Sequence, residues 1–179
     1  MIIFLLADGF EETEAIAPLD ILKRAGLEVK TVGINSKIVV GSHGVAVVAD
    51  LLPGEVNLSE VSLAVFPGGM PGSLNLDASP FTDEVINAVI KNGGRLAAIC
   101  AAPLIFGRRN LLSGKRAICY PGFEEELKGA IISSESVVTD GNITTAKGAG
   151  VALEFGKELV SLICTKEKGD SILAAMMKP

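Results

Sequence analysis

The chain has 179 residues, of which 49% are hydrophobic, and a net charge of −5 at pH 7. This length suits one domain with a full core, which we predict to span residues 1–179. An acidic chain without a basic stripe argues against nucleic acid as the main partner. No apolar run approaches the roughly 18 residues that cross a bilayer, so we expect no membrane association. The opening MIIFLLADGF has no basic lead and predicts a buried strand rather than a signal peptide.

The three cysteines, Cys100, Cys119 and Cys164, are odd in number and widely spaced. This usage predicts reduced thiols in the cytoplasm rather than a disulfide framework. One histidine and the lack of a Cys-x-x-Cys pair predict no metal site. Cys119 and Cys164 have no special surroundings, and we interpret them as structural.

Short apolar runs bounded by glycine or proline predict strands buried on both faces, at residues 2–7, 62–66 and 95–99. Helical patterns follow them, at residues 12–26, 81–94 and 150–163. This alternation predicts an α/β fold whose mostly parallel sheet carries helices on both faces. Two β-rich runs joined by Gly-Ser-His-Gly predict an inserted β-hairpin at residues 37–50.

Ligands of such sheets collect beyond the carboxyl ends of the strands. Three strand ends here carry unusual residues: ADGFEETE after 2–7, FPGGMPGSLN after 62–66, and Cys100 after 95–99. We expect a site where these three segments meet.

Cys100 begins a strand-to-helix turn if APLIFGRRN continues as a helix with Pro103 in its first turn. Ala98 and Ala102 are the small neighbours that a sharp nucleophile-bearing turn requires. The free N–H groups at the start of such a helix favour a thiolate. A packed, inert core cysteine is the alternative interpretation.

The acidic residues at the start of helix 12–26 fall on different faces of the helix when residues are placed at 100° intervals. Glu12 falls on the polar side, whereas Glu14 lies on the apolar arc with Pro18 and Ile21. A carboxyl on a buried stripe is costly without a partner. Either Glu14 has such a partner, or an irregular helix start lets it reach water.

Two glycine-rich segments are candidate anion sites. PGGMPG (67–72) leaves backbone N–H groups free, but it lacks the ending of a phosphate-binding P-loop. AKGAG (146–150) is more typical of a tight turn. We therefore predict no nucleotide cofactor.

Taken together, the motifs ADGFEETEAIAPLDILKRAG, FPGGMPG, LAAICAAP, CYPG and KGAG resemble the ThiJ/PfpI (DJ-1-like) family in order and spacing. The resemblance implies a flavodoxin-like three-layer sandwich, usually a homodimer. It also implies that Cys100 is the nucleophile at an elbow, that Glu14 is its carboxyl partner, and that the amides of Gly69 and Ala101 form an oxyanion hole.

Departures from the family patterns narrow the function. Protease-like members carry a histidine where this chain has Ala101, so peptidase activity is not expected. No histidine follows Cys100, which excludes the triad of class I glutamine amidotransferases. Some relatives have a histidine where this chain has Tyr120, which at pH 7 is a proton donor rather than a base.

Charge constrains the implied pair of Cys100 and Glu14. Two anions about 4 Å apart repel by roughly 4 kcal/mol at an effective dielectric near 20, so the pair shares one proton. We predict that the sulfur is the anion and that protonated Glu14 donates a hydrogen bond to it.

The resemblance and this chemistry predict a glyoxalase or deglycase that needs no cofactor. The substrate is methylglyoxal, glyoxal or an early protein adduct, with specificity from His43, Tyr120 and Arg24 reaching across a dimer interface. His43 is alternatively an exposed hairpin tip. A second hypothesis is a redox sensor or chaperone whose Cys100 is oxidised by peroxide, and a third is a domain with an idle cysteine.

Overall fold

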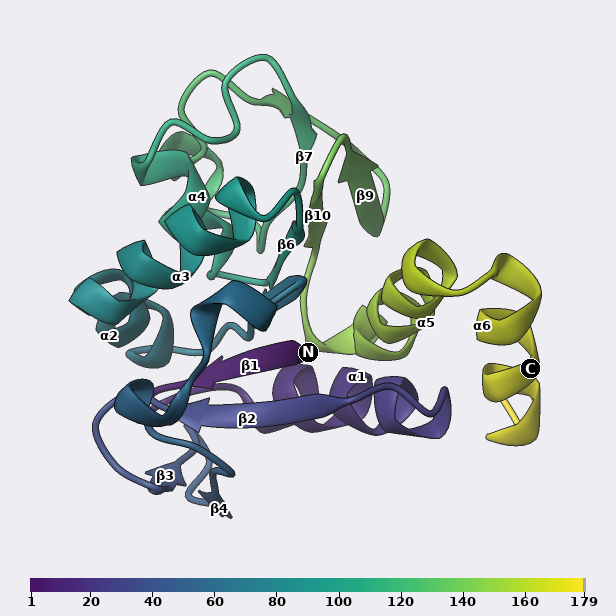
Figure 1. The fold of residues 1–179 in the computed structure, drawn as a ribbon. Helices are drawn as coiled ribbons and strands as arrows, with labels where there is room; N and C mark the ends of the chain where they lie inside the picture. The colour runs from purple at the N-terminus through teal and green to yellow at the C-terminus, as the bar shows by residue number, and fades with distance from the viewer. Residues whose placement is uncertain (179) are drawn as a thin grey trace.

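The fold was analysed in a computed structural model, which describes residues 1–178. Ten strands alternate with six α-helices in these residues (Figure 1). The strands are β1 (Ile2–Leu6), β2 (Val29–Gly33), β3 (Ile38–Val40), β4 (Ala46–Val48), β5 (Leu63–Phe66), β6 (Arg95–Ile99), β7 (Arg116–Ala117), β8 (Ile131–Ile132), β9 (Val137–Asp140) and β10 (Ile143–Ala146). The helices are α1 (Glu12–Arg24), α2 (Gly72–Asp77), α3 (Pro80–Lys91), α4 (Pro103–Arg108), α5 (Ala152–Ile163) and α6 (Lys166–Ala175).

The main sheet has six strands in the order β2-β1-β5-β6-β10-β9. The first five pair in parallel, and β9 closes the edge antiparallel to β10. This is the 2-1-3-4-5 strand order of flavodoxin-like sheets with one edge strand added. The predicted α/β class, with a mostly parallel sheet, is confirmed.

Helices cover both faces of the sheet because successive side chains of each strand point to opposite sides. Ile3 and Leu5 of β1 pack into the core beneath α2, α3 and α4, whereas Ile2 and Phe4 pack beneath α1, α5 and α6. The two helix groups lie on opposite sides of the sheet in Figure 1. Continuous apolar strands are therefore buried on both faces, as their sequences predict.

Helix α1 begins beyond the carboxyl end of β1, so its first turn lies at that edge of the sheet. Its N-cap residue Glu11 accepts a hydrogen bond from the Glu14 N–H at 2.7 Å. The helix packs tightly on α5, where a Cβ added at Gly156 would lie 2.8 Å from Pro18 Cα. The helix ends at Arg24, slightly before the predicted residue 26.

The predicted hairpin is confirmed as the antiparallel pair β3–β4, which forms a sheet of its own. The backbone N–H of Gly9 donates to the carbonyl of Val40 at 2.8 Å, and the N–H of Val40 donates to Asp8 at 2.9 Å. The hairpin is thus attached to the loop between β1 and α1. Within residues 1–178, no helix has both the length and the apolar character to span a membrane.

Candidate active site

Cys100 occupies a strained turn between β6 and α4. Its backbone has φ of 65°, a left-handed conformation that residues other than glycine rarely adopt. The turn is held on both sides, since its N–H donates to Ala146 at 2.9 Å and its carbonyl accepts from the Tyr120 N–H at 2.8 Å. Ala98 and Ala102 are fully buried around it. The predicted elbow is therefore present, and the cysteine is partly exposed rather than sealed in the core.

The helix after the elbow is shorter than expected. Helix α4 begins at Pro103 and ends at Arg108, so the terminal residues Arg109 and Asn110 of the predicted segment are outside it. Pro103 stands in the first turn, as predicted. With six residues, α4 offers the sulfur a small dipole, and individual N–H groups become the main stabilising contacts.

Glu14 is 1% exposed, which confirms its place on a buried stripe and rules out the alternative that it reaches water. One carboxylate oxygen accepts a hydrogen bond from the Gly68 N–H at 3.0 Å. The carboxyl also faces the thiol of Cys100 and the backbone of Ala149, and both interactions favour its charged form. Burial outweighs these contacts and raises the pKa of Glu14 to about 7.

The pKa of the Cys100 thiol is raised to about 12, first by burial and then by the charge of Glu14. The backbone N–H groups of Ala101 and Gly69 act in the opposite direction and lower it. Since both pKa values are raised, the pair keeps a proton through neutral pH, as the charge argument predicts. The raised thiol pKa opposes a free thiolate in the resting protein. The location of the shared proton, on the sulfur or on the carboxyl, therefore stays a prediction.

The loop after β5 supplies the contacts from the other side of the site. A Cβ at Gly68 would lie 2.6 Å from the Cys100 Cβ, so this position has no room for a side chain. Gly69 has φ of 90°, and the carbonyl of Gly68 accepts the Glu11 N–H at 2.9 Å. These contacts bring the three predicted strand ends together. Sequence reasoning had selected Gly69 and missed Gly68.

Tyr120 lies beside the elbow, with 51% of its surface exposed. Tyr120, Pro121 and residues 147–151 line an open pocket of about 350 Å³. A Cβ added at Gly148 would lie 4.0 Å from Cys100 Sγ and 3.3 Å from the Tyr120 ring, so the lining of the pocket passes close to the sulfur. The AKGAG segment, interpreted above as a tight turn, is therefore part of the site.

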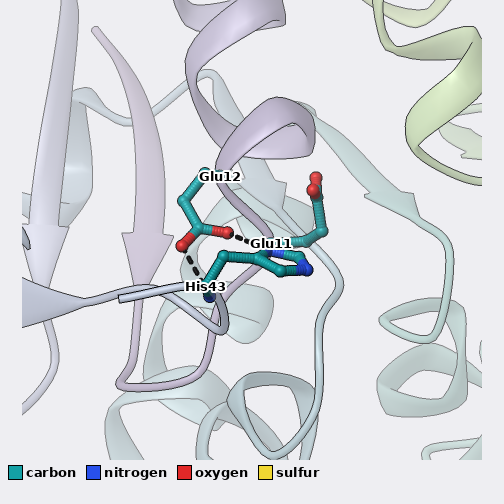
Figure 2. A group of neighbouring side chains, drawn as sticks. All are labelled: Glu11, Glu12 and His43. Carbon is teal, nitrogen blue, oxygen red and sulfur yellow. Dashed lines mark hydrogen bonds and ion pairs between the residues drawn. The ribbon is translucent and has the colours of Figure 1, made fainter. Parts of the chain in front are cut away.

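His43 lies at the hairpin tip and is exposed, and its contacts are with Glu12 (Figure 2). Its N–H and its Nδ1 each lie 2.8 Å from a Glu12 carboxylate oxygen. Partial burial of the Glu12 carboxyl is outweighed by these bonds, which lower its pKa to about 2. The hydrogen bond to Glu12 and the charge of that carboxylate raise the pKa of His43. Glu12 therefore anchors the hairpin instead of facing solvent, since the hairpin covers the polar side of α1.

Glu11, Glu12 and His43 offer oxygen and nitrogen atoms within 4.8 Å of one another, close enough for a shared metal ion (Figure 2). The hydrogen bonds just described already use the Glu12 carboxylate and Nδ1 of His43. Acidic groups on a surface gather in this way without a metal, so the prediction of a metal-free protein is unchanged.

Arg24, a predicted specificity residue, lies away from the elbow within one chain. Arg24 ends α1, at the opposite end from Glu14, and pairs with Asp20 at 2.7 Å. Its predicted reach across a dimer interface stays a prediction.

Cys119 is buried, as a structural cysteine should be, whereas Cys164 is exposed at the end of α5. The structural interpretation of Cys164 stays a prediction.

The fold and the site together define a class of proteins. Its members are flavodoxin-like sandwiches that carry a cysteine at a strained strand-to-helix turn, with a buried carboxyl beside it. The model of the DJ-1/PfpI family matches residues 1–162. The chain is 36% identical to protein DJ-1 homolog B of Arabidopsis thaliana over 97% of its own length, but spans 41% of that relative. It is 29% identical to glutathione-independent glyoxalase DJR-1.2 of Caenorhabditis elegans, covering 96% of this chain and 92% of the relative.

Further relatives agree with this assignment. Deglycase PfpI of Pyrococcus furiosus is 31% identical, with 90% of this chain and 98% of the relative covered. The solved structure of oxidized Toxoplasma gondii DJ-1 superposes with a TM-score of 0.93 at 31% identity, covering 98% of this chain and 97% of that one. The chain belongs to the DJ-1/PfpI family. Glyoxalase and deglycase activities are functions named within this family.

Proposed function

We propose that the protein is a glyoxalase or deglycase that needs no cofactor, with Cys100 as its nucleophile. The observation that carries the proposal is the close approach of the buried carboxyl of Glu14 to the partly exposed Cys100, because a Cβ added at Gly68 would meet both residues at once. A carboxyl with a pKa of about 7 is suited to take and return protons at neutral pH. The substrates are methylglyoxal, glyoxal or their early adducts on protein amines.

In the first step, the sulfur of Cys100 bonds to the aldehyde carbon of methylglyoxal. The C=O π bond opens onto its oxygen, which the N–H groups of Gly69 and Ala101 stabilise before it takes the thiol proton. Both N–H groups already interact with the sulfur. Their position beside the attacking sulfur supports their assignment as the oxyanion hole.

In the second step, Glu14 removes the proton from the sulfur-bound carbon, the ketone oxygen takes up a proton to give an enediol, and Glu14 returns its proton to the neighbouring carbon as the hydroxyl on the sulfur-bound carbon loses its proton and becomes C=O. The product is a thioester that carries a hydroxyl group. Water then adds to the thioester carbon, and the C–S bond breaks to release lactate and the thiol. The net reaction adds one water to methylglyoxal, so no electron acceptor or reductant is required.

Lactate release from methylglyoxal by purified, metal-free and glutathione-free protein tests this function. We expect Cys100→Ala and Glu14→Gln each to lower kcat/KM by at least about a hundredfold, the scale of nucleophile and proton-transfer losses. Cys164→Ala is the matched control, because its thiol is exposed and at the end of α5. Absence of lactate with the parent protein would overturn the proposal.

The second candidate is a peroxide sensor. The sulfur of Cys100 is accessible, and the adjacent carboxyl can hydrogen-bond an oxidised sulfur. Each hydrogen peroxide transfers one oxygen to sulfur and leaves as water, so two equivalents give a sulfinate. Peroxide-treated protein that stops at two added oxygens on Cys100, without turnover of methylglyoxal, supports the sensor over the enzyme.

We also propose a homodimer. The hairpin exposes 60% of Ile38 and 73% of Val48, which pair across β3 and β4. Apolar side chains grouped on a surface mark interaction sites. Light scattering should give twice the chain mass, and Val48→Lys should shift the protein toward a monomer.

A further inference from the structure

The pocket beside Cys100 is larger than methylglyoxal requires. Its volume of about 350 Å³ lies within the range of about 300–1,000 Å³ for pockets that hold small-molecule ligands. The proposed reaction takes place beside this pocket, because an added Cβ at Gly148 of the lining would lie 4.0 Å from the sulfur. Most of the volume is therefore available to a part of the substrate that does not react.

The lining of the pocket combines an apolar surface with one cation. Tyr120, Pro121 and Val151 provide apolar and aromatic contacts, and Lys147 is the one charged residue of the lining. Within residues 1–178, Lys147 forms no ion pair, in contrast to Lys157 and Arg116, which pair with carboxylates. An unpaired cation in a mostly apolar pocket is suited to an anionic group on a ligand.

The segment that carries Lys147 is fixed to the reacting groups. The Lys147 N–H donates to the Ser136 carbonyl at 3.0 Å, and the next residue but one, Ala149, hydrogen-bonds Glu14 through its backbone. Gly148 lies between them, where an added Cβ would be 4.0 Å from Cys100 Sγ and 3.3 Å from the Tyr120 ring. The backbone from which the exposed Lys147 side chain extends is thereby held beside the nucleophile and the proton carrier.

We propose that Lys147 is a specificity-determining residue that selects substrates with a carboxylate beyond the reacting carbonyl. Tyr120 and Val151 contact the intervening carbon chain. This inference rests on the proposed function and names its substrate class: 2-oxoaldehydes, or their amine adducts, that carry a carboxylate. The carboxylate takes no part in the bond changes described above.

Alkylation of Cys100 tests the cation without any turnover. Iodoacetate and iodoacetamide both form an S–C bond as iodide leaves, but only the first reagent carries a carboxylate. In a Cys164→Ser background, we expect Lys147→Met to lower the ratio of the iodoacetate rate to the iodoacetamide rate at Cys100 about fivefold, as one partly screened charge would. Lys147→Arg should keep the ratio, and Lys91→Met, which removes an exposed cation from the end of α3, should leave it unchanged.

Turnover provides the second measurement. The substrate 4,5-dioxopentanoate is compared with its methyl ester, which has the same carbon chain without the charge. We expect the ratio of their kcat/KM values to fall in Lys147→Met and to recover in Lys147→Arg. An alkylation ratio that does not change in Lys147→Met overturns the inference. A changed alkylation ratio with no turnover of any oxoaldehyde overturns the proposed function and leaves the anion preference standing.

Discussion

The carboxyl of Glu14 lies beside Cys100 and shifts the pKa of its thiol, although the two residues come from opposite halves of the chain. Helix α1 brings the carboxyl to the sheet edge, and the elbow after β6 brings the sulfur to the same point. The Gly68 N–H holds the carboxyl at 3.0 Å, so its position does not depend on the thiol alone.

The rate of Cys100 alkylation by iodoacetamide should rise with pH and level off after a midpoint near 7. In this range the pair loses its first proton, because the pKa of Glu14 is raised to about 7 by burial. Glu14→Gln removes the proton acceptor, so we expect at least about a tenfold lower rate at pH 7 and a midpoint above 8. A parent protein with the profile of a free thiol, near 8.5, would show that the pair is not coupled.

Burial of Glu14 should also make the folded state less stable as pH rises. The carboxyl has an ordinary pKa of 4.5 when unfolded and about 7 when folded, so between these values the unfolded state releases the proton first. The stabilising effect of the neutral carboxyl is complete below about 4.5 and is lost as pH rises through 7. Denaturant unfolding should show that Glu14→Gln gains about 2 kcal/mol relative to the parent between pH 5 and pH 8.

The matched control for this titration is Glu28→Gln, which changes an exposed glutamate in the segment before β2. Its stability relative to the parent should be nearly constant over the same range. If Glu14→Gln behaves like this control, Glu14 is ionised in the folded protein and cannot serve as the proton carrier.

Gly68→Ala should abolish activity without unfolding the protein. The added methyl group would meet the Glu14 carboxylate and lie 2.6 Å from the Cys100 Cβ, so one of the two reacting groups must move. A shift of about 1 Å costs about a hundredfold in rate. Gly150→Ala is the control in the same site, because an added Cβ there has no neighbour within 4 Å. Equal activity in the two variants would argue against close packing at Gly68.

The hairpin should loosen when Glu12 is changed. Its carboxylate accepts hydrogen bonds from the His43 N–H at 2.8 Å and the Val45 N–H at 3.4 Å, and it pairs with the His43 ring. Glu12→Ala should lower the local stability of the hairpin by about 1–3 kcal/mol, seen as faster amide hydrogen exchange at residues 43 and 45. His43→Ala should have a smaller effect, because the backbone bonds remain.

The same carboxylate predicts acid sensitivity of the hairpin. The pKa of Glu12 is lowered to about 2, so its stabilising bonds are complete above about 4.5 and are lost as pH falls toward 2. Hairpin amides that exchange equally fast at pH 3 and pH 6, after correction for intrinsic rates, would contradict the anchoring role of Glu12.

The parts of the site that form within one helix or one turn could be predicted from the sequence. Helical periodicity identified Glu14 because every turn of α1 repeats its buried face, and Ala98 and Ala102 identified the sharp turn at Cys100. Glu12 was placed toward solvent because no helical periodicity can show that a hairpin about thirty residues later covers it. Tertiary contacts of this kind are not encoded in the spacing of one helix.

Contacts from distant loops could not be predicted in the same way. The backbone N–H groups of Gly68 and Ala149 bind Glu14 from two other strand ends, and a main-chain donor has no residue signature. Lys147 was overlooked since its segment resembles an ordinary turn. Helix α6 was also missed, although Thr165 caps it by accepting the Lys168 N–H at 3.2 Å, a signal that the sequence does contain.

The central claim is that Cys100 bonds to the substrate carbon while Glu14 moves the proton. Rapid acid quenching during methylglyoxal turnover, followed by peptide mass spectrometry, tests it most directly. We expect one methylglyoxal equivalent on the peptide that contains Cys100, absent in Cys100→Ala and accumulating as the unrearranged adduct in Glu14→Gln. Full lactate production without any adduct on Cys100 would show that the sulfur does not bond to the substrate.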